Sequence, residues 1–332
     1  MGIDFTGGSL FMVLLLFAAG LLCIIKGGDL FVDAASWIAE ASGIPKFIIG
    51  ATVVSFATTM PEMLVSVFAA LQGNADIAVG NAVGSVTANV GLIMCVALIC
   101  MECAMTRKQF GVKACLLLAA ILALFGFTRD GQLSVLESVL ILVIFVGFLV
   151  ESLIAARQEQ GSELPAQEER PKIDKKTVLL NIGKFLLGAA GIVLGAQLLI
   201  DNGSALARML GVPDAVIAAT MIAIGTSLPE LVTTIISIRK KQASLSVGNI
   251  IGANLFNLVL VSGVSVTLAP FEVPVGKTIF GINSSLILDM PLMIVVMALL
   301  TVPALTTKKL HRWQGIVLLC IYAAFCAIQF GL

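Results

Sequence analysis

Charged residues are scarce in this sequence. Only 12% of the 332 residues are charged and 59% are hydrophobic, whereas about a quarter of the residues in soluble domains are charged. Basic and acidic residues balance at 20 each, so the net charge does not favour a nucleic-acid partner. Because the apolar excess extends along the whole chain, we expect an all-α polytopic membrane protein in contact with the lipid bilayer.

Common catalytic motifs are also missing. The sequence has no HExxH, GxSxG or Walker-type loop, which removes the usual grounds for an intramembrane protease, an esterase or an ATP-driven pump. Six of the seven cysteines lie in apolar runs, as buried structural thiols do, so the thiols predict neither a metal site nor a disulfide. The single histidine, His311, lies between basic residues in a loop. We therefore expect neither an enzyme nor a bound cofactor.

Ten segments are apolar and long enough to span a bilayer, which takes about 20 residues. The polar segment 157–176 is taken as a short loop between an N-terminal half, 1–156, and a C-terminal half, 177–332. The stretches 27–44 and 201–212 could be interfacial or could extend the neighbouring spans. The expected spans are 9–25, 45–71, 76–101, 111–127, 132–156, 177–200, 213–238, 244–269, 281–302 and 311–330.

The basic residues are distributed unevenly about these spans. Of the 20, all but Arg129, Arg208 and Lys277 fall on the side of the central loop. Positive charge favours the cytoplasmic side, so we expect a cytoplasmic loop and both termini outside. This topology predicts a multi-pass protein of the plasma (inner) membrane, which we expect to act as a monomer.

The two halves repeat the same polar pattern. An offset of 168 residues carries Thr58, Pro61 and Glu62 onto Thr226, Pro229 and Glu230. The match extends without gaps over the segments 51–91 and 219–259, which we take as two ion-binding motifs. Because each half has an odd number of spans, the second half must enter the membrane from the opposite side. Repeats of opposite topology are typical of secondary transporters.

The first motif places polar groups on one face of an apolar helix. Thr58 and Glu62 are four residues apart, so they share a face. Pro61 has no N–H, which predicts a helix break and an unpartnered carbonyl at Ala57. Irregular backbone at membrane depth is tolerated only beside protein or a water-filled cavity.

The second motif supplies the same groups from Thr226, Ser227, Pro229 and Glu230. A buried glutamate could instead be a protonated, structural residue, but the repeated spacing favours function. Two carboxylates that meet near the midplane would repel each other unless a cation neutralises them. Hydroxyl, carboxylate and carbonyl oxygens are hard ligands that suit Ca²⁺ and Na⁺, and the empty pair could also accept a proton.

The spans after each motif helix read GNAVGSVTANVG and GNIIGANLFNLV. Glycines four residues apart typically mean close helix packing. Asparagine carbonyls are neutral oxygen ligands, so these spans could also complete a cation cage. We expect both roles, with packing assigned to Gly80, Gly84, Gly248 and Gly252 and candidate ligands to Ser85, Asn89 and Asn257. Asp289, in the ninth predicted span, is a further acid of interest.

The motifs TTMPE with GNAVGSVTAN, and GTSLPE with GNIIGANLFN, resemble those of the calcium/cation antiporter superfamily, which includes the sodium/calcium exchangers. The chain is most similar to the short prokaryotic branch. The resemblance implies that the first and sixth spans slide over a rigid core. It also implies a central Ca²⁺ site at Thr58, Glu62, Thr226 and Glu230, and Na⁺ sites at Thr59, Ser85 and Ser227 with carbonyls near Ser55 and Ala223.

Two positions depart from the family pattern. Ala253 replaces a common serine, and Asn257 replaces the aspartate of many sodium exchangers. These departures weaken the expectation of K⁺ coupling and keep proton coupling open. The leading hypothesis is a secondary antiporter that exchanges cytoplasmic Ca²⁺ for external Na⁺. The alternatives are a Ca²⁺/H⁺ antiporter that uses the same glutamates and, from another class, a cation sensor or membrane scaffold without transport.

Overall fold

A computed structural model of the chain describes residues 9–72, 75–101, 103–104, 107–130, 132–158, 173–211, 225, 227–268, 271–272, 278–279, 282–283 and 288–330. The predicted ligands Ala223 and Thr226, and half of the predicted span 213–238, lie outside these residues. The long helices are α1 (Leu10–Ser42), α3 (Ser55–Leu71), α4 (Ala75–Ala88), α6 (Arg107–Phe127), α7 (Val135–Gln158), α8 (Lys175–Met209), α11 (Leu228–Arg239), α12 (Ala243–Leu255), α14 (Met290–Thr307) and α15 (Arg312–Phe330).

Shorter elements connect the long helices. Three antiparallel pairs of two-residue strands lie in the connections: β1 (Cys103–Ala104) with β6 (Lys309–Leu310), β2 (Gln132–Leu133) with β3 (Phe271–Glu272), and β4 (Thr278–Ile279) with β5 (Ile282–Asn283). The short helical segments are α2 (Lys46–Ile49), α5 (Cys95–Cys100), α13 (Ser262–Leu268), the π-helical turns η1 (Gly50–Val54), η2 (Asn89–Met94) and η5 (Phe256–Val261), and the 3₁₀ turn η3 (Thr128–Asp130).

The apolar helices agree with a membrane protein. Within the described chain, eight helical stretches are long and apolar enough to cross a membrane, and α15 adds a shorter apolar helix. These nine overlap predicted spans, while α11 covers the described part of the predicted span 213–238. The expected all-helical membrane fold is therefore confirmed.

The helices at two of the predicted spans are longer than the spans themselves. The predicted span 9–25 is part of α1, which continues to Ser42, and the span 177–200 is part of α8, which continues to Met209. The stretches 27–44 and 201–212 thus extend the neighbouring helices instead of lying at the interface as separate segments. The sequence KGGD suggests an interruption, but a Cβ on Gly27 would lie 2.9 Å from the carbonyl oxygen of Gly188, so the glycine allows close packing inside a continuous helix. In α14 the helix begins at Met290, later than the predicted 281, because Pro291 favours a helix start.

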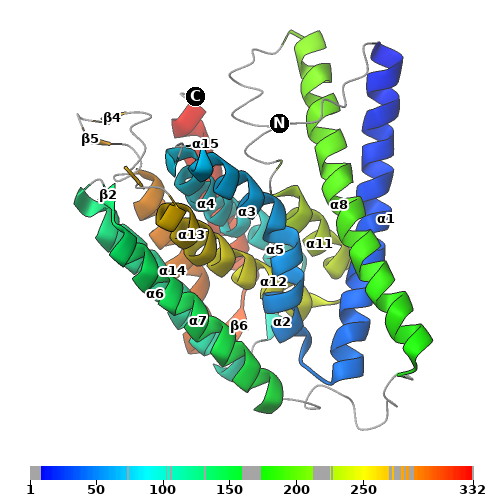
Figure 1. The fold of residues 1–332 in the computed structure, drawn as a ribbon, viewed down its shortest axis with the longest axis horizontal. Helices are drawn as coiled ribbons and strands as arrows, with labels where there is room; N and C mark the ends of the chain where they lie inside the picture. Colours follow the sequence, from blue (N-terminus) through cyan, green and yellow to red (C-terminus); the bar gives the residue numbers. More distant parts are fainter. Residues whose placement is uncertain are drawn as a thin grey trace.

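Helices α1 and α8 lie side by side along one edge of the molecule (Figure 1). Their backbones approach closely, because an ideal Cβ on Gly188 would lie 2.6 Å from the backbone nitrogen of Phe31. The other helices form a bundle beside this pair (Figure 1). The two long helices are therefore packed primarily on each other.

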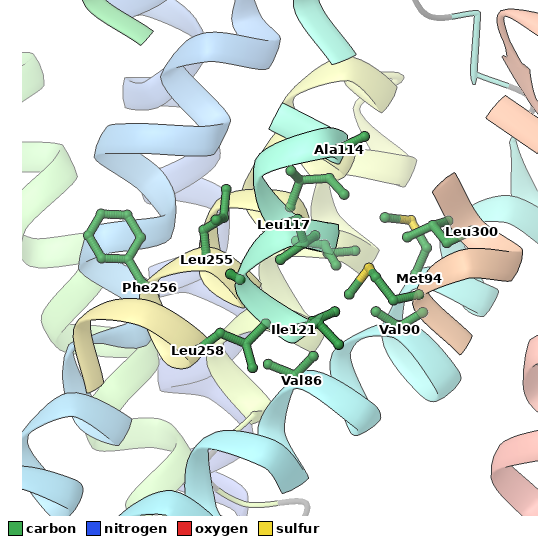
Figure 2. Close-up of a cluster of buried hydrophobic side chains, with 14 of the residues drawn as sticks. Val86, Val90, Met94, Ala114, Leu117, Ile121, Leu255, Phe256, Leu258 and Leu300 are labelled. Atoms are coloured by element: carbon green, nitrogen blue, oxygen red, sulfur yellow. The ribbon is translucent and has the colours of Figure 1, made fainter. Parts of the chain in front are cut away.

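The bundle has one large apolar core. Figure 2 shows part of it, where side chains from α4 and η2 meet those of α6, η5 and α14. Val86, Leu117, Ile121 and Leu258 are fully buried there. This packing holds the polar segments of α4, α12 and the π-helical turns in place. The labelled core residues are Val86, Val90, Met94, Ala114, Leu117, Ile121, Leu255, Phe256, Leu258 and Leu300.

Candidate cation-binding site

Three π-helical turns lie beside the predicted motif residues. η1 ends directly before Ser55, η2 begins at Asn89, and η5 contains Asn257. A π-helical turn interrupts regular α-helical hydrogen bonding and frequently marks a functional site. The asparagines in η2 and η5 are related by the offset of 168 residues. Irregular backbone thus occurs at corresponding places in the two halves.

The two motif prolines differ in their surroundings. Pro61 lies inside α3, which is assigned as continuous helix from Ser55 to Leu71, so the predicted helix break at this residue is wrong. The irregular turn is η1, which precedes α3. Pro229, in contrast, lies in the first turn of α11, where the missing N–H of a proline costs no helical hydrogen bond. Neighbouring packing sustains α3 through its proline, an effect that the local sequence does not encode.

The two motif glutamates are completely buried. Glu62 comes from α3 and Glu230 from the first turn of α11, and these two helices are in contact. Thr59 Oγ1 donates a hydrogen bond of 3.2 Å to Glu230 Oε1. Among the described residues, neither carboxylate oxygen of Glu62, nor Oε2 of Glu230, has a hydrogen-bond partner. Burying such charges is costly unless opposite charge compensates them.

Buried neutral oxygen atoms accompany the carboxylates. The side-chain amides of Asn89, Asn254 and Asn257 are fully buried, and neither polar atom of each has a partner in the described part of the chain. Ser227, which precedes α11, likewise has an unpartnered buried hydroxyl there. Because buried polar groups in native proteins nearly always have partners, these exceptions require an explanation. A cation with oxygen ligands fits this donor set.

Other polar side chains connect the helices that carry the glutamates. Thr58 Oγ1 donates to Asn249 Oδ1 of α12 at 3.2 Å, and Asn249 Nδ2 donates to Thr233 Oγ1 of α11 at 3.0 Å. Asn81 Nδ2 of α4 donates to Ser66 Oγ at 3.0 Å and to the carbonyl oxygen of Glu62 at 3.4 Å. These bonds hold the segments on which Glu62 and Glu230 lie.

Sequence reasoning missed Ser66 and Thr234. Each lies four residues after a motif glutamate, on the same helix face, and the offset of 168 relates them. Both are buried, and the hydroxyl of Thr234 has no partner among the described residues. The repeat itself was the signal that could have identified this pair.

The remaining predicted positions are placed as follows. Ser55 and Ser85 are buried on α3 and α4, and Ser55 Oγ donates to the carbonyl oxygen of Thr52 at 3.1 Å.

A Cβ on Gly248 or Gly252 would collide with backbone carbonyls of Phe47 or Ala51, which shows close approach of α12 to the segment before α3. Gly80 and Gly84 have no described atom within 4 Å of an ideal Cβ position. The repeat would place the latter glycines against 215–223, which lies outside the described residues. Asp289 is half-buried in a helical turn directly before α14, and residues 284–287 before it lie outside the described chain.

Comparison with known proteins gives matches over nearly the whole chain. The family model described as sodium/calcium exchanger protein matches residues 12–154 and 180–331. The sodium/calcium exchanger MaX1 of Methanosarcina acetivorans is 30% identical, over 96% of this chain and 98% of its own length. The inner membrane protein YrbG of Escherichia coli is 35% identical, over 78% of this chain and 80% of its own. The solved structure of the sodium-calcium exchanger NCX_Mj, soaked with Na⁺ and Sr²⁺, superposes with a TM-score of 0.80 at 25% identity, covering 97% of this chain and 99% of that one.

Proposed function

Because this chain belongs to the sodium/calcium exchanger protein family, we propose that it is a secondary antiporter that exports cytoplasmic Ca²⁺ in exchange for external Na⁺. The observation that carries the proposal is the pair of fully buried glutamates, Glu62 and Glu230, on two different motif helices. Their unpartnered oxygens offer about the charge that one Ca²⁺ ion needs. No other acid in the described membrane helices is buried to this extent.

Coupling follows from shared ligands. The central Ca²⁺ site uses Thr58, Glu62, Thr226 and Glu230, and the monovalent sites use Thr59, Ser85 and Ser227 with the neighbouring positions Ser55, Asn89, Ala223 and Asn257. Because the same carboxylates serve both loads, one Ca²⁺ or several Na⁺ ions can occupy the cavity, but not both. The bound load then determines which conformations are populated, and exchange results.

Alternating access requires two halves of opposite topology. We assign ten spans in two inverted halves, 1–156 and 177–332, with the loop 157–176 cytoplasmic and both termini outside. Two features support the repeat: the π-helical turns at Asn89 and Asn257, and the left-handed glycines Gly43 and Gly211 after α1 and α8, which all follow the offset of 168 residues. The packing of α1 on α8 suits a pair that moves as one unit. The transporter is expected to work as a monomer.

Proton coupling is the second candidate. Ala253 and Asn257 are both fully buried, and neither side chain carries the hydroxyl or carboxylate that would strengthen a Na⁺ site. The same glutamates could then release protons when they bind Ca²⁺. A sensor or scaffold without transport is the remaining alternative, but it gives no reason for matched acids in two halves.

Transport into proteoliposomes distinguishes these functions. We expect ⁴⁵Ca²⁺ uptake when the vesicles contain Na⁺ and the outside does not. Uptake that needs an outward H⁺ gradient and ignores Na⁺ would replace Na⁺ coupling with H⁺ coupling. Absence of ⁴⁵Ca²⁺ uptake under both the Na⁺ gradient and the H⁺ gradient would reject the antiporter.

The glutamate pair is tested by removing one charge at a time. We expect Glu62→Gln and Glu230→Gln each to weaken Ca²⁺ affinity by at least about a hundredfold, because breaking a buried charge cluster costs about 3–5 kcal/mol. The control is Asp130→Asn, which removes an exposed carboxylate near the end of α6. Normal exchange by either glutamine variant would eliminate the proposed site.

A further inference from the structure

Asn249 differs from the other buried asparagines of the site because both ends of its amide are used. Its Oδ1 accepts from Thr58 Oγ1 at 3.2 Å, and its Nδ2 donates to Thr233 Oγ1 at 3.0 Å. All three side chains are buried. Asn249 lies on α12, Thr58 on α3 and Thr233 on α11, so one amide joins the helices that carry Glu62 and Glu230.

The hydrogen bonds of Thr233 determine the orientation of this amide. The Thr233 hydroxyl has one proton, which it donates within its own helix to the carbonyl oxygen of Pro229 at 2.9 Å or of Glu230 at 3.0 Å. These distances are shorter than the 3.3 Å from Thr58 Oγ1 to its own in-helix acceptor, the carbonyl oxygen of Ser55, so Thr233 is the better placed to accept a hydrogen bond from Asn249 Nδ2. The amide oxygen consequently faces Thr58.

This orientation has a consequence for Thr58. The single proton of its hydroxyl can go to Asn249 Oδ1, to the carbonyl oxygen of Ser55 at 3.3 Å in its own helix, or to the neighbouring carboxylate of Glu230. A hydroxyl coordinates a cation through its oxygen lone pairs, so its proton must point elsewhere. Asn249 offers an acceptor across the helix interface that keeps the Thr58 oxygen available.

We propose that Asn249 is a positioning residue for the cation site: it holds the Thr58 hydroxyl in its ligating orientation and sets the separation of α3 and α11, without binding the ion itself. This inference rests on the proposed function. It separates Asn249 from Asn89, Asn254 and Asn257, whose amide atoms lack partners in the described chain and remain candidate ligands.

Asn81, the repeat-related residue of the first half, provides a matched control. Its Nδ2 donates to Ser66 Oγ and to the backbone carbonyl of Glu62, and Thr58 is not among these partners. An Asn81 variant therefore removes a half-buried amide from the corresponding position without changing the acceptor for Thr58.

The experiment is a double-mutant cycle on ⁴⁵Ca²⁺ binding to the full-length protein in detergent. We expect Asn249→Ala and Thr58→Val each to weaken Ca²⁺ binding about tenfold, the lower end of the effect of removing a second-layer partner. The double variant should be at most about threefold weaker than Thr58→Val alone, because the two changes remove the same interaction. Asn81→Ala combined with Thr58→Val should instead give the product of the single effects.

Each contrary result has a distinct meaning. Independent losses in the Asn249 and Thr58 cycle would overturn the positioning role, and so would an Asn249→Ala protein with wild-type affinity and a lower ion-free melting temperature. Should the alanine variant not be monodisperse, Asn249→Ser takes its place in the cycle. If the wild-type protein binds no Ca²⁺, the proposed function fails together with this inference; if it binds Ca²⁺ and the cycle is additive, only the inference fails.

Discussion

At the scale of single residues, the site is a set of buried oxygen atoms with too few donors. Glu62 and Glu230 together present three carboxylate oxygens without a partner in the described chain, and Thr59 supplies the one hydrogen bond to the fourth. An arrangement of this kind is stable only when positive charge enters it. The proposed function therefore links ion binding to protein stability at these residues.

Asn257 offers a direct test of this linkage. Its amide is fully buried, so Asn257→Asp adds a third carboxylate beside the pair. We expect a lower melting temperature without ions, because another charge is buried, and a larger rise on adding Ca²⁺. At saturating Ca²⁺, each tenfold gain in affinity adds about 1.4 kcal/mol of ion-dependent stability.

The matched control for this variant is Asn202→Asp, which introduces a carboxylate at a buried amide of α8 that no motif contains. It should lower the ion-free melting temperature without enlarging the Ca²⁺ response. An unchanged Ca²⁺ response in Asn257→Asp would place Asn257 outside the ion site.

At the scale of the elements, packing of α12 on the segment before α3 locates one side of the cavity. Gly252 lies against the carbonyl oxygen of Ala51 and the hydroxyl of Ser55, where no Cβ fits. We expect Gly252→Ala to destabilise the protein by about 1–3 kcal/mol, the usual cost of overpacking. Thermal unfolding in detergent measures this loss.

Gly126, near the end of α6, serves as the comparison. It is exposed, with no described atom within 4 Å of an ideal Cβ. Gly126→Ala should therefore change the melting temperature little, or raise it slightly, because alanine favours the helix by up to about 1 kcal/mol. Equal destabilisation by the two variants would contradict the close approach assigned to Gly252.

At the scale of the whole molecule, the two repeat-related junctions of the α1–α8 pair with the bundle differ. Where α1 meets α11, Gly28 lies against Ile236, and Lys240 Nζ lies 2.6 Å from Asp33 Oδ1. Where α8 faces α3, a groove of about 1020 Å³ separates the helices. One junction is closed while its counterpart is open, which is the asymmetry expected of alternating access.

The ion pair at the closed junction should influence this equilibrium. Lys240 also lies near Asp29 Oδ1, at 3.5 Å. The repeat places Gln72, which lines the groove, where Lys240 stands in the second half, so the open junction has no matching lysine. Because such partly exposed pairs contribute about 0.2–1 kcal/mol, we expect Lys240→Gln to open the closed junction about 1.4- to 5-fold more often.

Thiol accessibility measures this opening. In a background without the seven native cysteines, Ser237→Cys places a thiol at a buried position of α11. Its modification rate by a water-soluble reagent should rise about 1.4- to 5-fold with Lys240→Gln, as the pair energy above requires. Lys241→Gln, at the exposed neighbouring lysine, is the charge control. Equal rates in both variants would show that the ion pair does not hold the junction closed.

The sequence by itself determined the class of the molecule and the identity of its central residues. The membrane spans follow from the length of the apolar segments. Glu62 and Glu230 stand out because a charged residue inside an apolar span is energetically costly, and the repeat places one in each half. Only the tertiary structure decided what depends on neighbours distant in the chain. Gly27 stays helical because α8 packs on it, Pro61 stays inside α3 while η1 takes the irregular turn, and Asn249 uses its amide between two helices. Each of these outcomes depends on contacts between segments far apart in sequence, whose energies local propensity does not contain.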